Sequence, residues 1–138
     1  MIQYQGKTIM IRKTILPVLL TTIWISLSEF LRNEFLLKSY WTEHYNNLGL
    51  VFPSDPVNGA VWGVWSLLFA IVVFILAKRF NLIKTALLAW FTGFVLMWVA
   101  IGNLGVLPYT LLYIAVPWSL LEALVAAWII KKLTTKQG

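Results

Sequence analysis

Residues 22–34 read TIWISLSEFLRNE, which places a glutamate, an arginine and an asparagine inside a long apolar segment. On a helical wheel of about 100° per residue, Arg32 and Asn33 lie within about 60° of Glu29. The same face carries Thr22, Ile25, Ser26 and Leu36, and the opposite face carries Trp24, Leu27, Leu31 and Glu34. The pattern predicts a helix whose polar stripe faces protein, with Glu29 and Arg32 neutralising each other one turn apart.

The composition around this stretch is that of a membrane protein. The chain is 60% hydrophobic and 12% charged, whereas soluble domains average about a quarter charged residues. Each membrane crossing takes about 20 residues, so a chain of this length has no room for a large soluble catalytic domain. The basic residues flank apolar segments, where they set orientation, so we expect the lipid bilayer and no nucleic acid as a partner. The sequence has no cysteine, which excludes disulfides and thiolate metal sites.

Hydropathy predicts one all-α domain, a polytopic membrane four-helix bundle. The expected helices are residues 14–37, 56–79, 85–102 and 108–130. Residues 39–55 are expected to form an aromatic outer connection that lies at the membrane interface. No small-x-small cleavage site follows the first apolar run, so it is read as an uncleaved helix, although residues 1–9 are expected to be dispensable. Asp55 and Pro56 are a typical helix start, as N-cap and first residue. The distribution of basic residues predicts both termini in the cytoplasm, in a bacterial inner membrane.

Two helices of the same direction share a short sequence likeness. Residues 65–70 read WSLLFA and residues 118–123 read WSLLEA, at a constant offset, with Glu122 in the place of Phe69. The likeness predicts two helical hairpins related as a parallel repeat, an architecture common among transport proteins. The alternative is convergence, because apolar helices draw on few residue types.

Each of the last three helices carries a seam of small or polar residues at heptad-like spacing. Such residues let helices approach closely in lipid, so the seams predict close packing around one axis. Packing alone is the alternative explanation for them. The seams are Gly59, Gly63, Ser66, Ala70 and Ala77; Ala86, Ala89, Gly93, Ala100 and Asn103; and Ala115, Ser119, Glu122 and Ala126.

The charged residues of the stripe and seams are the candidates for a functional site. A charge in the middle of a membrane helix costs about 2.5 to 3.5 kcal/mol, so its retention needs compensation or a function. Glu122 has no basic residue within a turn, and burial favours its neutral form. Counting along the helices puts Glu29 about 20 Å and Glu122 about 12 Å from the inner boundary, which predicts a polar path rather than one compact pair. The candidate residues are Glu29, Arg32, Asn33, Ser66, Asn103, Ser119 and Glu122.

Three functions fit these features. The first is an oligomeric transporter or channel for an ion or small solute, with the intramembrane acids lining the route. The second is a binding or accessory subunit of a larger membrane complex, which needs nothing beyond a satisfied polar stripe. The third is an enzyme acting on lipid at the outer face through Glu34, Glu43 and His44, which no recognisable catalytic arrangement supports. No cofactor is expected, and the single histidine predicts no metal site.

Overall fold

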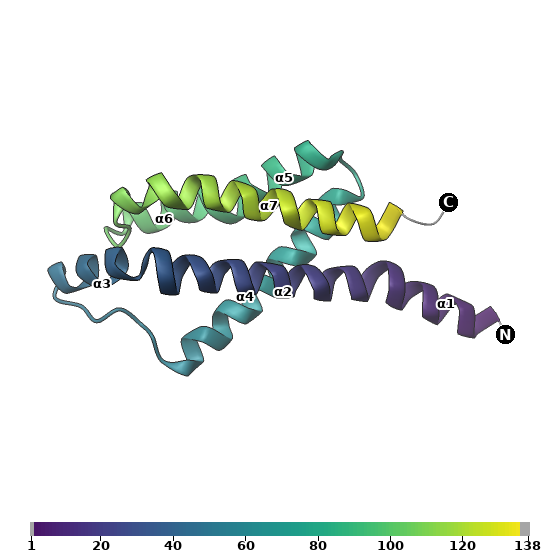
Figure 1. The fold of residues 1–138 in the computed structure, drawn as a ribbon, viewed down its shortest axis with the longest axis horizontal. Helices are drawn as coiled ribbons and strands as arrows, with labels where there is room; N and C mark the ends of the chain where they lie inside the picture. The colour runs from purple at the N-terminus through teal and green to yellow at the C-terminus, as the bar shows by residue number, and fades with distance from the viewer. Residues whose placement is uncertain (1, 136–138) are drawn as a thin grey trace.

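The computed structural model describes residues 2–135, which fold as helices joined by short connections and contain no strand (Figure 1). The α-helices are α1 (Ile2–Met10), α2 (Leu16–Leu31), α3 (Lys38–Asn47), α4 (Pro56–Ala77), α5 (Leu82–Trp90), α6 (Leu96–Asn103) and α7 (Leu112–Thr135). Three π-helical turns, Ile11–Ile15, Arg32–Leu36 and Phe91–Val95, continue these helices, and a 3-10 turn, Tyr109–Leu111, precedes α7. Within the described residues, four helical segments are long and apolar enough to cross a membrane: Ile2–Leu36, Pro56–Ala77, Leu82–Asn103 and Tyr109–Thr135. The all-α prediction and the four helices long and apolar enough to span a membrane are therefore confirmed.

The first membrane segment is longer than the predicted helix of residues 14–37. It runs from Ile2 to Leu36, about 50 Å at 1.5 Å per residue, whereas the apolar core of a bilayer is about 30 Å thick. The excess is α1, which has no buried residue and projects beyond the other helices (Figure 1). Hydropathy missed α1 because its residues are too polar for a membrane segment.

The connections also differ in detail from the prediction. The segment of residues 39–55 contains a helix, α3, where an interfacial connection was expected. Asp55 caps α4 as predicted, in a reciprocal arrangement with Asn58, and Pro56 is the first residue of the helix. Asn81 caps α5 through its side chain, which accepts from the backbone N–H of Lys84, so this helix begins before residue 85.

The helices are arranged in pairs. α2 packs on α4 and on α7, and α5 packs on α7. Figure 1 places α3 and the α6–α7 connection at one end of the bundle, here called the α3 end. The start of α1, the α4–α5 turn and the end of α7 lie toward the other, here called the terminal end. α4 and α7 run in the same direction, as the repeat requires, and the repeat itself stays a prediction.

Packing is tight in the terminal half of the bundle. The core there is formed largely by alanine and phenylalanine, including Phe69, Ala70, Val73, Phe74, Ala77, Ala86, Ala89, Phe94, Ala126 and Ala127. Gly93 belongs to this region because a Cβ atom on it would lie 2.5 Å from Cε2 of Phe69. Here the small-residue seams pack closely, as predicted.

At the α3 end, the small residues of the seams do not bring the helices into contact. Gly59 and Gly63 of α4 are exposed, and a Cβ atom added to either would meet nothing within 4 Å. Ala100 of α6 is also exposed. Figure 1 shows the reason: α4 crosses the bundle obliquely, so that its first half diverges from α2. Small residues permit close approach but do not enforce it, and this divergence leaves space beside the polar stripe.

Candidate functional site

The site is built around a buried ion pair on the first membrane segment. Glu29 and Arg32 are each only 4% exposed, and Nη2 of Arg32 lies 2.5 Å from Oε2 of Glu29. The side chain of Asn33 donates a second hydrogen bond to the same oxygen, at 3.1 Å. The other oxygen of Glu29, Oε1, has no hydrogen-bond partner among residues 2–135. The predicted pairing of Glu29 with Arg32 is therefore present, but it leaves acceptor capacity unused.

A π-helical turn changes which residues the stripe presents. The turn covers Arg32–Leu36, and it carries Leu36 to an exposed position although an ideal wheel put it beside Glu29. π-helical turns inside α-helices often occur at functional sites. The guanidinium carbon of Arg32 lies 5.1 Å from the ring centroid of Phe94, so the positive charge is close to both an aromatic ring and the carboxylate of Glu29. The buried face of α2 is also broader than predicted and includes Thr21 and Ser28.

Glu122 of α7 joins this cluster instead of lying a turn or two below it. Its side chain is fully buried, and its carboxyl group lies close to the side chains of Glu29, Arg32 and Ser28. Trp24 ties the two helices together, because its indole N–H donates to the backbone oxygen of Glu122 at 3.1 Å. Trp24 therefore faces α7, whereas the wheel placed it on the opposite face of α2.

The separation predicted for the two acids was wrong for an identifiable reason. It was counted from an inner boundary assumed for each helix, whereas the first membrane segment begins at Ile2 and α7 continues to Thr135. The helix ends therefore give no common level from which the depths of Glu29 and Glu122 can be compared. The structure brings the two acids into one compact cluster.

The cluster contains two carboxyl groups and one guanidinium group. Both oxygens of Glu122, Oε1 of Glu29, and Nε and Nη1 of Arg32 have no hydrogen-bond partner within the described part of the chain. Two carboxyl groups that face each other can share a hydrogen bond only if one of them carries a proton, and two adjacent carboxylates repel. The cluster therefore buries two acids beside a single base, with donor and acceptor atoms that the described residues leave unpaired.

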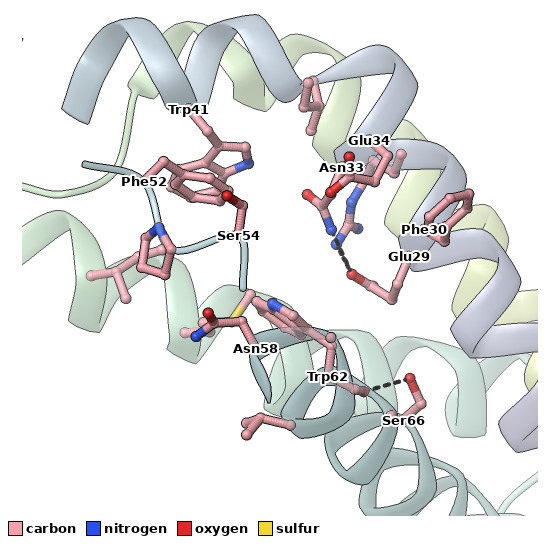
Figure 2. Close-up of a pocket in the computed structure, with 18 of the residues that line it drawn as sticks. Glu29, Phe30, Asn33, Glu34, Trp41, Phe52, Ser54, Asn58, Trp62 and Ser66 are labelled. Atoms are coloured by element: carbon pink, nitrogen blue, oxygen red, sulfur yellow. Dashed lines mark hydrogen bonds and ion pairs between the residues drawn. The ribbon is translucent and has the colours of Figure 1, made fainter. Parts of the chain in front are cut away.

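A cavity of about 630 Å³ lies beside this cluster at the α3 end. Glu29, Arg32 and Asn33 line one side of it, and the diverging half of α4 contributes Trp62 and Ser66 on the other. Figure 2 shows Glu29 and Asn33 pointing from the first membrane segment toward the space in front of Trp62 and Ser66. Its aromatic lining consists of Phe30, Trp41, Tyr45, Phe52, Trp62 and Trp98. The cavity is thus lined by aromatic rings, and the charged residues Glu29 and Arg32 lie along one side of it.

Aromatic residues of the predicted connection, residues 39–55, form part of the lining of this cavity. Trp41 of α3 stacks on Phe52 with ring centroids 5.7 Å apart, and Tyr45 meets Phe52 edge to face at 5.2 Å. The sequence feature that could have predicted this lining was the high aromatic content of residues 39–55, which we interpreted as an interfacial segment. Nothing in the local pattern indicated that these rings fold back over the stripe of α2.

The remaining predicted site residues are dispersed. Ser66 lines the cavity and donates to the backbone oxygen of Trp62. Ser119 is buried, and its hydroxyl accepts a hydrogen bond from the indole N–H of Trp90 at 2.9 Å. Asn103 is exposed at the end of α6 and does not line the cavity.

Two of the three polar residues proposed for a surface enzyme, Glu34 and His44, have structural partners. Glu34 pairs with Lys38 at 3.2 Å, with both side chains largely exposed. Nε2 of His44 lies 2.9 Å from the backbone oxygen of Gly105, which connects α3 to the α6–α7 turn. Residues 2–135 contain no group of histidine and acidic side chains arranged to hold a metal ion. Comparison of the chain with protein-family models, with curated proteins and with solved structures gives no match.

Proposed function

We propose that the protein transports a small solute across the membrane and couples this to protonation of the cluster formed by Glu29, Arg32 and Glu122. The observation that carries the proposal is a buried cluster with one acid more than it has bases, of which Glu29 and Arg32 line the side of a cavity large enough for a solute. Burying ionisable groups in a membrane is expensive, and where they occur they usually mark ion or substrate pathways. A site where a proton and a solute compete for the same carboxyl groups can exchange one for the other.

The uneven packing of the bundle supports this proposal. A cavity open at the α3 end and closed by alanine and phenylalanine packing toward the terminal end is the arrangement expected of one state of an alternating-access protein. With both termini in the cytoplasm, the cavity faces the outside of a bacterial inner membrane. The tight terminal half offers no route within one copy, so the proposal includes a homo-oligomer in which helices of neighbouring copies move relative to one another.

The second candidate is a binding or accessory subunit of a membrane complex. The same closed terminal half favours it, because a binding protein needs a cavity but no exit. In that case the ion pair and Glu122 would hold α2 and α7 together, and the cavity would receive a ligand or a partner segment.

Flux through reconstituted vesicles separates the two functions. We expect the wild-type protein to move at least one member of a panel of inorganic ions, organic ions and neutral solutes in a pH-dependent manner. Glu122→Gln keeps the size of a protonated acid but cannot exchange a proton, so it should abolish the pH dependence and leave the fold intact. Glu43→Gln, an acid of α3 outside the cavity lining, is the matched control and should behave as wild type.

Two results would count against the proposal. The first is an absence of flux from the wild-type protein over the whole panel, with folding verified in the same vesicles, which would favour the accessory role. The second is a pH-dependent flux that Glu122→Gln leaves unchanged, which would refute coupling through the cluster.

A further inference from the structure

We infer that the cavity binds an organic cation with an apolar, ring-containing body. The inference rests on the proposed function insofar as the cavity is taken as the solute site. It is carried by two independent features of the lining, its charge and its aromatic faces.

The charge of the cavity opposes that of the whole chain. The protein has a formal net charge of +6, with 11 basic and 5 acidic residues. Three of those acids, Glu29, Glu34 and Asp55, line the cavity, together with a single basic residue, Arg32. Lys38 partly neutralises Glu34 across an exposed pair. The cavity is therefore an acidic site in a basic protein, and a concave site with walls of low dielectric constant concentrates the field of its charges.

The aromatic lining favours a cation whose charge is spread over an apolar body. A cation within about 6 Å of an aromatic face is attracted by the ring quadrupole, and tryptophan is the strongest such partner. Trp41, Trp62 and Trp98 all line the cavity. Figure 2 shows Trp41 and Phe52 on one side of the space and Trp62 on another, so a bound molecule would meet rings from several directions. A small hydrated metal ion could not use these surfaces.

Anionic and neutral ligands fit the lining less well. The charge of Arg32 is already held by Glu29 at 2.5 Å and by the ring of Phe94. Its unpartnered donors, Nε and Nη1, are buried, whereas Asp55 is an exposed acidic residue of the lining. A neutral ligand would contact the rings but leave the acidic excess uncompensated. The volume of about 630 Å³ lies in the usual range of about 300 to 1,000 Å³ for sites that take drug-sized molecules.

A pair of ions that share shape and size but differ in charge tests this inference. Tetraphenylphosphonium is the cationic probe and tetraphenylborate its anionic counterpart. Binding of each to the purified full-length protein in neutral detergent is measured by equilibrium dialysis, with empty micelles as the reference for partitioning. We expect saturable binding of the cation at least roughly tenfold tighter than that of the anion, because rings and acids both favour positive charge.

Two variants locate the binding in this cavity. Trp62→Leu removes a partly exposed ring of the lining and should weaken cation binding roughly three- to tenfold; Trp128→Leu, a ring of α7 outside the lining, should not. Asp55→Asn removes a charge but keeps a good helix cap, so the fold is preserved. It should weaken cation binding roughly twofold or more at low salt, and less at high salt because the charge is exposed.

The outcomes separate this inference from the proposed transport. Equal binding of the two ions, or cation binding that neither Trp62→Leu nor Asp55→Asn weakens, would overturn the ligand class. Saturable cation binding with no flux from any solute would uphold the ligand class and refute transport. Proton-coupled flux of a neutral or anionic solute, with no binding of tetraphenylphosphonium, would uphold transport and refute the ligand class.

Discussion

Replacing Arg32 by leucine should destabilise the protein strongly. The side chains of Arg32 and Glu29 are both 5% exposed, so their ion pair is buried. Leucine removes the positive charge and leaves the carboxyl groups of Glu29 and Glu122 facing each other without a cation. Removing one partner of a buried pair typically lowers the free energy of unfolding by about 3 to 5 kcal/mol. Loss of the contact between Arg32 and Phe94 adds to this.

A matched exposed pair gives the scale for comparison. Glu34 and Lys38 lie 3.2 Å apart on the same segment, with side chains 41% and 61% exposed respectively. Exposed pairs contribute less than about 1 kcal/mol, so Glu34→Ala should change stability little. The double variant Glu29→Gln with Arg32→Leu removes both charges of the buried pair, and it should recover part of the stability that Arg32→Leu loses.

Unfolding in detergent, followed by tryptophan fluorescence during heating or titration with a denaturing detergent, measures these differences. The loss in Arg32→Leu should be smaller at acidic pH, where added protons neutralise the carboxyl groups left without a cation. Equal stability of Arg32→Leu and Glu34→Ala would refute the reasoning, as would a double variant less stable than Arg32→Leu alone.

Two further predictions concern packing and topology. Gly93→Ala should lower the unfolding temperature because its Cβ atom would meet the ring of Phe69 at 2.5 Å, whereas the Cβ atom of Gly63→Ala would enter open space, so that variant should be neutral or stabilising. Equal effects of the two variants on thermal unfolding would contradict the packing described for the two ends of the bundle. Single cysteines at Gln5 and Asn47, introduced into a chain that has none, should react with an impermeant thiol reagent from opposite sides of the membrane; labelling from the same side would exclude four crossings with a cytoplasmic N-terminus.

The number and type of membrane segments could be predicted because hydropathy and helix starts are local signals. Asp55 caps α4 as its position before Pro56 indicated. The ion pair between Glu29 and Arg32 was predictable for the same reason, since residues one turn apart on a helix are neighbours whatever the rest of the fold does. Local pattern therefore identified the charged stripe on which the site is built.

The arrangement around that stripe depends on features that local pattern does not encode. The π-helical turn beginning at Arg32 shifts every later residue relative to an ideal wheel, which is why Leu36 is exposed. The oblique path of α4 opens space at Gly59 and Gly63, where the seam predicted contact. The first membrane segment begins at Ile2 and α7 ends at Thr135, so the boundaries from which the depths of Glu29 and Glu122 were counted do not match the helix ends. Each of these is a tertiary or geometric effect, and together they convert a predicted polar path into a cluster beside a cavity.

The central claim is that a bound solute and a proton compete for the buried acids. It is tested most directly by adding tetraphenylphosphonium to purified protein in weakly buffered detergent solution while the pH is recorded. Wild-type protein should release protons in proportion to the cation bound, and Glu122→Gln should bind the cation and release markedly fewer protons. Saturable binding by the wild-type protein without a change in pH, or equal release by Glu122→Gln, would contradict the account.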